Sequence, residues 1–201
     1  MVCYVVRRLS HAVCGRGNSK GNAMKEVIIM PGIGGSGEEH WQSRWQKAEP
    51  RARRFAPSSW DLPMLDDWIE ALDREMAKSA EPPLIVAHSL ACLLVAYWAQ
   101  RTSHSAAGAF LVAVPDPASP VFPVEAAGFG HPPTLALPFP SMVVASSSDP
   151  YGTLAYSYAL AARWGSAFID AGAHGHLNGS SGLGDWPEGR AALAAFEAGL
   201  G

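Results

Sequence analysis

The chain has 201 residues, of which 48% are hydrophobic and 16% are charged, and its formal net charge is −3 at pH 7. That length suits one domain, and this balance excludes an intrinsically disordered chain. The slightly acidic charge argues against nucleic acid as a partner, and no apolar run reaches the ~20 residues that a membrane span requires.

Residues 1–23 differ in composition from the rest of the chain. They hold four basic residues and no acidic one. Their apolar start, "MVCYVV", is interrupted by Arg7 and Arg8 and is too short for a secretory signal core. Organelle transit peptides are also Arg-rich and poor in acids, so that alternative stays open. We expect residues 1–23 to be a disordered extension and residues 24–201 to form a single cytoplasmic domain.

After this segment, short apolar runs alternate with helical patterns. The apolar runs predict buried strands at 27–30, 84–87, 107–115, 141–147 and 166–170. Residues 52–57, "ARRFAP", are a further strand candidate without such a run. The segments between these strands predict helices at 37–48, 64–79, 90–102, 152–165 and 187–200. We expect Glu38 and Glu39 in the first turn of the first helix, where the helix dipole favours acids. This alternation predicts the α/β class, with a mostly parallel sheet covered on both faces.

One region, residues 115–140, is rich in proline and holds eight of the sixteen prolines. Proline at this density is incompatible with a helix or a central strand, so we expect a surface loop or a short cap. Because the region follows a strand, and loops at the carboxyl ends of parallel strands line ligand sites, we expect it to border the site. The domain has no room for a large lid, which predicts a shallow and open pocket.

The strand at 84–87 turns into a helix with only His88 and Ser89 between them, in "VAHSLAC". Such a turn resembles the nucleophile elbow G-x-S-x-G, in which a strained backbone presents the serine hydroxyl above the sheet. Ala87 and Ala91 stand in place of the two glycines and are still small. The simpler alternative is that Ser89 only caps the helix. The strand before it and the helix after it favour the elbow.

A serine nucleophile needs a histidine base and an acid that orients it, and in α/β-hydrolases the order along the chain is serine, acid, histidine. Two histidines, His174 and His176, follow the last predicted strand. Asp149 follows the preceding strand in a turn-forming Asp-Pro, where it could also stabilise a turn. Asp116 is a competitor one strand earlier, and Asp170 lies too close to the histidines in sequence to be favoured.

The loop after the first strand, "PGIGGSGEEHW", carries four glycines between residues 32 and 37. Glycines let backbone N–H groups face a ligand. The spacing fits neither a dinucleotide fingerprint nor a P-loop, which also requires a lysine. We therefore expect an oxyanion donor from this loop, beside the N–H of Leu90. We expect no cofactor and no metal, because the pair His174 and His176 lacks acid or cysteine partners at ligand spacing.

The sequence resembles the small serine hydrolases related to the retinoblastoma-binding serine hydrolase and its bacterial relatives. The resemblance runs from about Met24 to the end of the chain and rests on "PGIGGSGEEHWQSRW", "WDLPMLDDWIEAL", "VAHSLAC", "SSSDPY" and "GHLNGSSGLGDWPEG". It implies a compact, three-layer α/β-hydrolase fold with little or no cap. It also implies a triad at the positions that match Ser89, Asp149 and His176.

The resemblance favours His176 over His174 and implies Ile33 and Leu90 as the backbone donors of the oxyanion hole. It gives a reaction type without a substrate. We therefore expect an esterase-like serine hydrolase that acts on a small acyl ester, thioester or amide through an acyl-enzyme. The alternatives are a non-catalytic binding protein on the same scaffold and an acyltransferase with the same residues. The expected partner is a small-molecule substrate, with no nucleic acid and no membrane, and a protein partner stays open.

Overall fold

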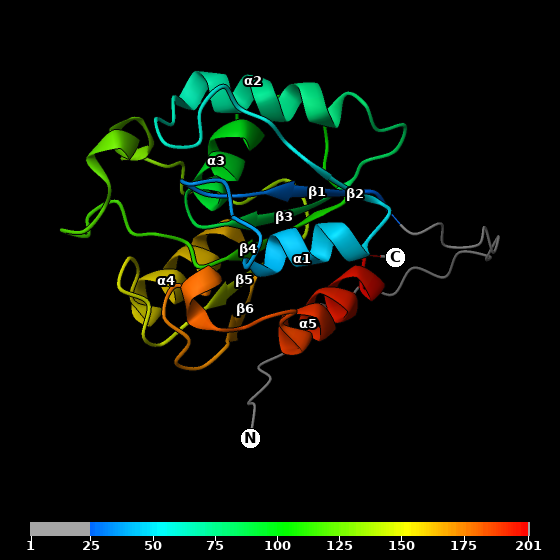
Figure 1. Cartoon of the computed structure of the whole chain (residues 1–201). Coiled ribbons are helices and arrows are strands. Elements are labelled where there is room, and N and C mark those ends of the chain that lie inside the picture. The colour runs from blue at the N-terminus through cyan, green and yellow to red at the C-terminus, as the bar shows by residue number, and fades with distance from the viewer. Residues whose placement is uncertain (1–24, 201) are drawn as a thin grey trace, which may run out of the picture.

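The computed structural model describes residues 25–200, so the extension expected at residues 1–23 lies outside the described residues. The strands are β1 Val27–Met30, β2 Ala52–Arg54, β3 Leu84–His88, β4 Gly108–Val112, β5 Ser141–Ala145 and β6 Ala167–Asp170. The α-helices are α1 Trp41–Ala48, α2 Leu65–Met76, α3 Leu90–Ala99, α4 Leu154–Trp164 and α5 Pro187–Ala198. Two 3-10 helices are η1 Val124–Phe129 and η2 Gly179–Ser181. Figure 1 shows these elements in chain order.

The six strands form one sheet in the order β2-β1-β3-β4-β5-β6, and every neighbouring pair is parallel. The chain runs from β1 outward to β2 and then crosses to β3 on the other side of β1. Such a reversal opens a crevice at the carboxyl ends of the two central strands, where doubly wound sheets bind ligands. The predicted α/β class with a mostly parallel sheet is therefore confirmed.

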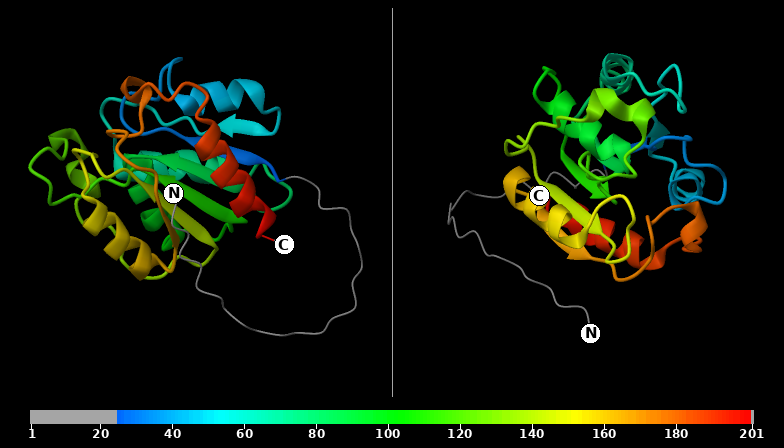
Figure 2. Two further views of the ribbon diagram at one scale, coloured as in Figure 1. Left: turned by 90° about the horizontal axis from the view of Figure 1, so that it is seen from below. Right: turned by 90° about the vertical axis from the view of Figure 1, so that its left-hand side faces the viewer.

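The sheet is the middle layer of three, because helices cover both of its faces (Figures 1 and 2). Helices α2, α3 and α4 contribute to the core on one face, and α1 and α5 to the core on the other. Within β1 the side chains alternate: Ile28 and Met30 belong to the first core, Val27 and Ile29 to the second. A strand buried on both faces appears in sequence as a continuous apolar run, which is the pattern that predicted it.

Helix α3 follows the central strand β3 and is apolar on all sides, because the sheet, α2 and η1 surround it. Its residues Leu90 to Trp98 are all buried. The helix ends at Ala99, before the predicted end near Thr102. Beyond Ala99 the N–H groups of the next residues bond to the carbonyls of Tyr97 and Trp98, which closes the helix.

The first predicted helix begins later than expected. Glu38 and Glu39 are exposed and precede α1, so the expectation that they form its first turn was wrong. His40 is the N-cap: its backbone is extended and its Nδ1 accepts the N–H of Gln42 over 3.2 Å. The imidazole thus takes the place of the short polar side chain that usually opens a helix, and that substitution hid the boundary.

The proline-rich region forms a loop with one short helix, η1, at the carboxyl edge of the sheet (Figure 1). Phe129 anchors it against Trp68 of α2, with ring centroids 5.6 Å apart. Residues 25–200 contain no separate cap domain, in agreement with the predicted architecture. In the same range, no helix combines the length and apolarity needed to cross a membrane.

Candidate active site

Ser89 occupies a sharp turn between β3 and α3. Its backbone angles are φ 56° and ψ −126°, a conformation that costs a residue with a side chain about 1–3 kcal/mol. The turn is held on both sides, because the Ser89 N–H donates to Val112 O over 2.9 Å and the Ser89 carbonyl accepts the Cys92 N–H over 2.9 Å. The flanking Ala87 and Ala91 are fully buried. Alanine at both glycine positions is therefore compatible with the elbow conformation.

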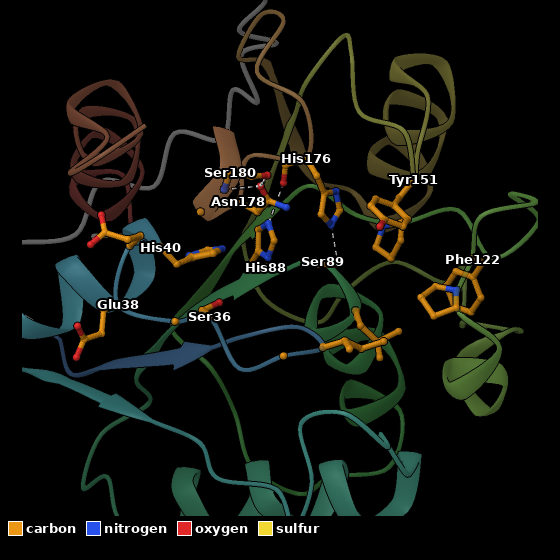
Figure 3. A pocket seen from close by; sticks show the side chains of 18 residues that line it. Ser36, Glu38, His40, His88, Ser89, Phe122, Tyr151, His176, Asn178 and Ser180 are labelled. Carbon is orange, nitrogen blue, oxygen red and sulfur yellow. Dashed lines mark hydrogen bonds between the residues drawn. The ribbon is translucent and has the colours of Figure 1, made fainter. Parts of the chain in front are cut away.

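The side chain of Ser89 does not cap the helix. It occupies the N-cap position of α3 but makes no capping hydrogen bond. Its Oγ lies instead 2.8 Å from Nε2 of His176, which is 87 residues away in the chain (Figure 3). The capping alternative for Ser89 is thereby removed.

Gly32, two residues after the end of β1, lies against the same turn. A Cβ on Gly32 would lie 2.9 Å from Ser89 Cβ and 3.2 Å from the carbonyl oxygen of His88. Real Cβ atoms essentially never approach a neighbour under 3.0 Å. Glycine is therefore required at this position, because the loop after β1 and the turn at Ser89, which we call the two central loops, approach each other closely. Ile33, the next residue, lines the same pocket as Ser89.

The imidazole of His176 is held by Asp149. Its Nδ1 lies 2.9 Å from both carboxylate oxygens, and the two side chains are only 9% and 3% exposed. A carboxylate can only accept here, so Nδ1 carries the proton and the Nε2 lone pair accepts from the Ser89 hydroxyl. Asp149 Oδ1 also accepts the Tyr151 N–H over 2.9 Å, so the expected turn role and the contact with His176 coexist.

The three competing side chains lie elsewhere. Asp116 and Asp170 each accept a main-chain N–H two residues further on, which is an ordinary turn interaction. His174 is exposed, and its ring makes no hydrogen bond within residues 25–200. Of the three candidate acids, only Asp149 reaches His176.

Two further histidines, His40 and His88, are buried beside the elbow. The Nε2–H of His88 donates to the main-chain oxygen of His176 over 2.9 Å, and burial holds the His88 pKa well below its ordinary value. Burial, aided by Arg54 and His176, lowers the pKa of His40 to about 4. Both rings are neutral near pH 7, and they meet edge to face with centroids 4.7 Å apart. His88 thus packs at the wall of the pocket.

A pocket of about 650 Å³ opens over Ser89 and His176. One side is apolar and is formed by Ile33, Leu90, Pro115, Phe122, Pro123 and Tyr151. The other side is polar and is formed by Ser36, Glu38, Glu39, His40, Asn178 and Ser180. Figure 3 shows the labelled residues of these two groups on opposite sides of Ser89. The proline-rich loop borders the pocket, as its position in the sequence predicted.

The N–H groups of Ile33 and Leu90 belong to the two loops that meet at Ser89. Both residues line the pocket, and Leu90 opens helix α3, whose N-terminal end favours negative charge. Within residues 25–200, neither N–H donates a hydrogen bond. Both N–H groups are thus available to an acceptor in the pocket.

Other pocket residues were not predicted from the sequence. The ring of Tyr151 packs against His176 with centroids 4.5 Å apart, and Phe122 forms the apolar wall with it. Tyr151 stands two residues after Asp149, and that spacing was the only available signal for it. Asn178 and Ser180 follow His176 in the chain and enter the pocket through η2.

Comparisons with known proteins agree with this architecture. A family model described as serine hydrolase matches residues 27–195. Among solved structures, a YdeN-like hydrolase from Pectobacterium atrosepticum is 29% identical with a TM-score of 0.77, over 87% of this chain and 91% of that chain. The ydeN gene product of B. subtilis is 21% identical with a TM-score of 0.74, over 87% and 99%.

A more distant likeness is found with the esterase domain of a Rhodothermus marinus protein. It is 14% identical with a TM-score of 0.65, over 91% of this chain and 90% of that chain. At such low identity the likeness shows the fold alone. A sequence search among curated proteins gave no match.

Proposed function

The chain belongs to the serine hydrolase family, and from this premise we propose that it cleaves a small acyl ester, thioester or amide through Ser89, His176 and Asp149. The observation that carries the proposal is the continuous chain of hydrogen bonds from the Ser89 hydroxyl through the imidazole to the carboxylate. The proposal takes the reaction to be cytoplasmic and its substrate to be a small molecule.

In the first half of the reaction, His176 Nε2 takes the proton of the Ser89 hydroxyl while Oγ attacks the substrate carbonyl. Asp149 keeps the Nδ1 proton on the other side of the ring and stabilises the imidazolium that forms. Nε2–H then gives its proton to the leaving alcohol, thiol or amine. The acyl group stays on Ser89 Oγ as an ester.

The negative charge that develops on the carbonyl oxygen needs donors that are already in place. The N–H groups of Leu90 and Ile33 fit this role, because both residues line the pocket beside Ser89 and neither N–H has an acceptor within the described chain. Losing one such donor typically costs about 3–4 kcal/mol of transition-state stabilisation. In the second half of the reaction, water attacks the acyl-enzyme with His176 again as base, and Ser89 is released.

The pocket supports a short or exposed acyl group. Its apolar side, with Phe122 and Tyr151, can receive a few methylene groups, and no lid domain in residues 25–200 encloses a longer chain. The polar side, with Asn178 and Ser180, suits a leaving group that forms hydrogen bonds. We therefore propose short-chain esters with a polar leaving group as the first substrates to try.

A fluorophosphonate probe tests the proposal directly, because it labels an activated serine and spares an ordinary one. The expected result is labelling of the wild-type chain at Ser89 and none in Ser89→Ala, with the same circular dichroism spectrum for both. A folded wild-type chain that is not labelled would favour a non-catalytic binding protein. Labelling with turnover only in the presence of an added alcohol or thiol would favour an acyltransferase.

A further inference from the structure

Arg54, the last residue of β2, is bonded to the glycine loop that follows β1. Its Nη1 donates to the main-chain oxygens of Gly35 over 2.6 Å and Ser36 over 3.2 Å. Its Nη2 donates to Ser43 Oγ over 2.8 Å, and its Nε donates to Gln46 Oε1 over 2.7 Å. The guanidinium thus joins this loop to helix α1, which follows it.

The charge of Arg54 has no acid beside it. Within residues 25–200, no carboxylate lies within 4 Å of its guanidinium. The neighbouring Arg53 behaves in the opposite way and pairs with Glu26 at 2.8 Å and Glu75 at 2.6 Å. A partly buried charge is costly unless its hydrogen bonds are satisfied, and at Arg54 four neutral oxygens satisfy them. Two of those four are carbonyls of the loop.

The loop needs an external support because its backbone is strained. Gly34, Gly35 and Ser36 have φ of 79°, 72° and 51°, which are three successive residues in the left-handed region. Ser36 has a Cβ, so this conformation is unfavourable for it. Arg54 is not the segment's sole support. The Gly34 N–H donates to Trp60 O at 3.2 Å, the Gly35 N–H donates to Gly32 O at 3.1 Å, and Ser36 Oγ donates to Gln42 at 2.9 Å. Ser43 Oγ, which accepts from Arg54, donates in turn to Ser36 O at 2.6 Å.

Ile33 lies directly before this strained segment, and Gly32 fixes the other end of the loop against Ser89. The direction of the Ile33 N–H therefore depends on how the three left-handed residues are held. We propose that Arg54 is a positioning residue, which holds the loop so that the Ile33 N–H points at the substrate oxygen. The inference rests on the proposed function and assigns a role to a residue that does not touch the substrate.

Arg54→Gln and Arg53→Gln form a matched pair, because the two arginines are adjacent on β2 and only Arg54 contacts the loop. In Arg54→Gln we expect kcat for a short ester to fall at least about tenfold, with KM within about threefold of wild type, because a misdirected donor weakens the transition state more than the ground state. In Arg53→Gln we expect kcat to stay within about twofold, although loss of its ion pairs lowers stability.

Hydrogen exchange gives a second measurement that does not need turnover. A peptide covering residues 31–40 should exchange faster in Arg54→Gln than in wild type and should be unchanged in Arg53→Gln. Arg54→Lys keeps the charge but cannot bond both carbonyls and both side chains, so we expect intermediate exchange and intermediate kcat. Should Arg54→Gln fail to fold, Arg54→Lys carries the same test.

Wild-type exchange or wild-type kcat in a folded Arg54 variant would overturn the inference, and so would an equal loss of kcat in Arg53→Gln. These outcomes differ from failure of the proposed function, in which the wild-type chain itself shows no Ser89-dependent turnover and the inference falls with it.

Discussion

The side chain of His88 donates a hydrogen bond from Nε2 to the main-chain oxygen of His176 over 2.9 Å. His88, directly before the candidate nucleophile Ser89, therefore holds the backbone of His176, whose ring faces that nucleophile. Both rings are buried, with centroids 5.0 Å apart. The elbow after β3 and the loop after β6 are thus linked to each other independently of the bond between Ser89 and His176.

Substitutions of His88 distinguish the contribution of this hydrogen bond from the contribution of side-chain packing. His88→Leu leaves the buried carbonyl of His176 without its donor, which should lower the free energy of unfolding by about 1–3 kcal/mol and reduce kcat. His88→Gln retains an N–H donor of similar reach, so its free energy of unfolding and its kcat should both fall less. Urea unfolding and ester turnover measure the two effects. Equal values for the two variants would show that the hydrogen bond contributes nothing.

Asp149→Asn tests the orienting carboxylate. The amide oxygen can still accept the Tyr151 N–H, so the turn and the melting temperature should be nearly unchanged. The preferred His176 tautomer is lost, however, and kcat should fall by about 10⁴-fold. Asp149→Ala loses the turn interaction as well and should also be less stable. Turnover in Asp149→Asn close to wild type would exclude Asp149 from this role.

Ser89 stores strain that glycine would release. Ser89→Ala and Ser89→Gly both lose the hydroxyl and should both be inactive. At φ 56° the glycine variant avoids the Cβ penalty, so we expect it to be more stable than the alanine variant by about 1 kcal/mol. Chemical denaturation of the two inactive variants measures the difference, and a more stable alanine variant would contradict the assigned strain.

The close approach at Gly32 predicts a sharp steric effect. Gly32→Ala places a Cβ 2.9 Å from Ser89 Cβ, so the backbone must move, and we expect a loss of about 1–3 kcal/mol in stability together with reduced kcat. Gly128→Ala is the control, since its Cβ would meet only Leu65 Cβ at 3.8 Å, an ordinary contact. Should both variants behave like wild type, the two central loops are less tightly packed than described.

Stability should fall as pH decreases from 7 towards 4. In the folded chain, burial lowers the pKa of His40 to about 4, whereas the unfolded chain has the ordinary value of about 6.5. Between these values the unfolded chain binds the extra proton, so the free energy of unfolding rises with pH. The contribution, on the order of 3 kcal/mol, is complete above the unfolded pKa and is lost as pH falls through the folded one.

His40→Asn isolates that effect, because asparagine also caps helices and does not titrate. Urea unfolding at pH 5 and pH 7.5 should show a smaller difference in the variant than in wild type. His88, whose pKa burial also lowers, should contribute with the same sign. An unchanged pH dependence in His40→Asn would mean that His40 is not the buried neutral group described.

The sheet could be predicted because its central strands are buried on both faces and appear as uninterrupted apolar runs, as at Leu84 to Ala87. Ser89, Asp149 and the pair His174 and His176 could be proposed because each follows a predicted strand, and the carboxyl ends of parallel strands meet at one edge. The choice of His176 over His174 came from the family resemblance. The start of α1 could not be predicted, because His40 caps this helix in place of a commoner capping residue. The order of the strands likewise depends on packing that no local pattern contains.

Arg54 shows a second limit of sequence reasoning. It lies in β2, a strand of only three residues with no fully buried member, next to a second arginine. Nothing in "ARRF" separates the arginine that pairs with acids from the one that binds the glycine loop. The distinction arises from the alternation of side chains across the strand and from the position of α1, both of which need the tertiary structure.

Strand β6, which carries the segment leading to His176, is the outermost strand on its side and pairs within residues 25–200 only with β5. The side chains of β6 and β2 are more exposed than those of the other four strands. Fraying at this margin would withdraw the imidazole from the hydroxyl while the central strands stay intact. On heating, turnover should therefore vanish at a lower temperature than ellipticity does, which makes activity the earlier sign of a weakening fold.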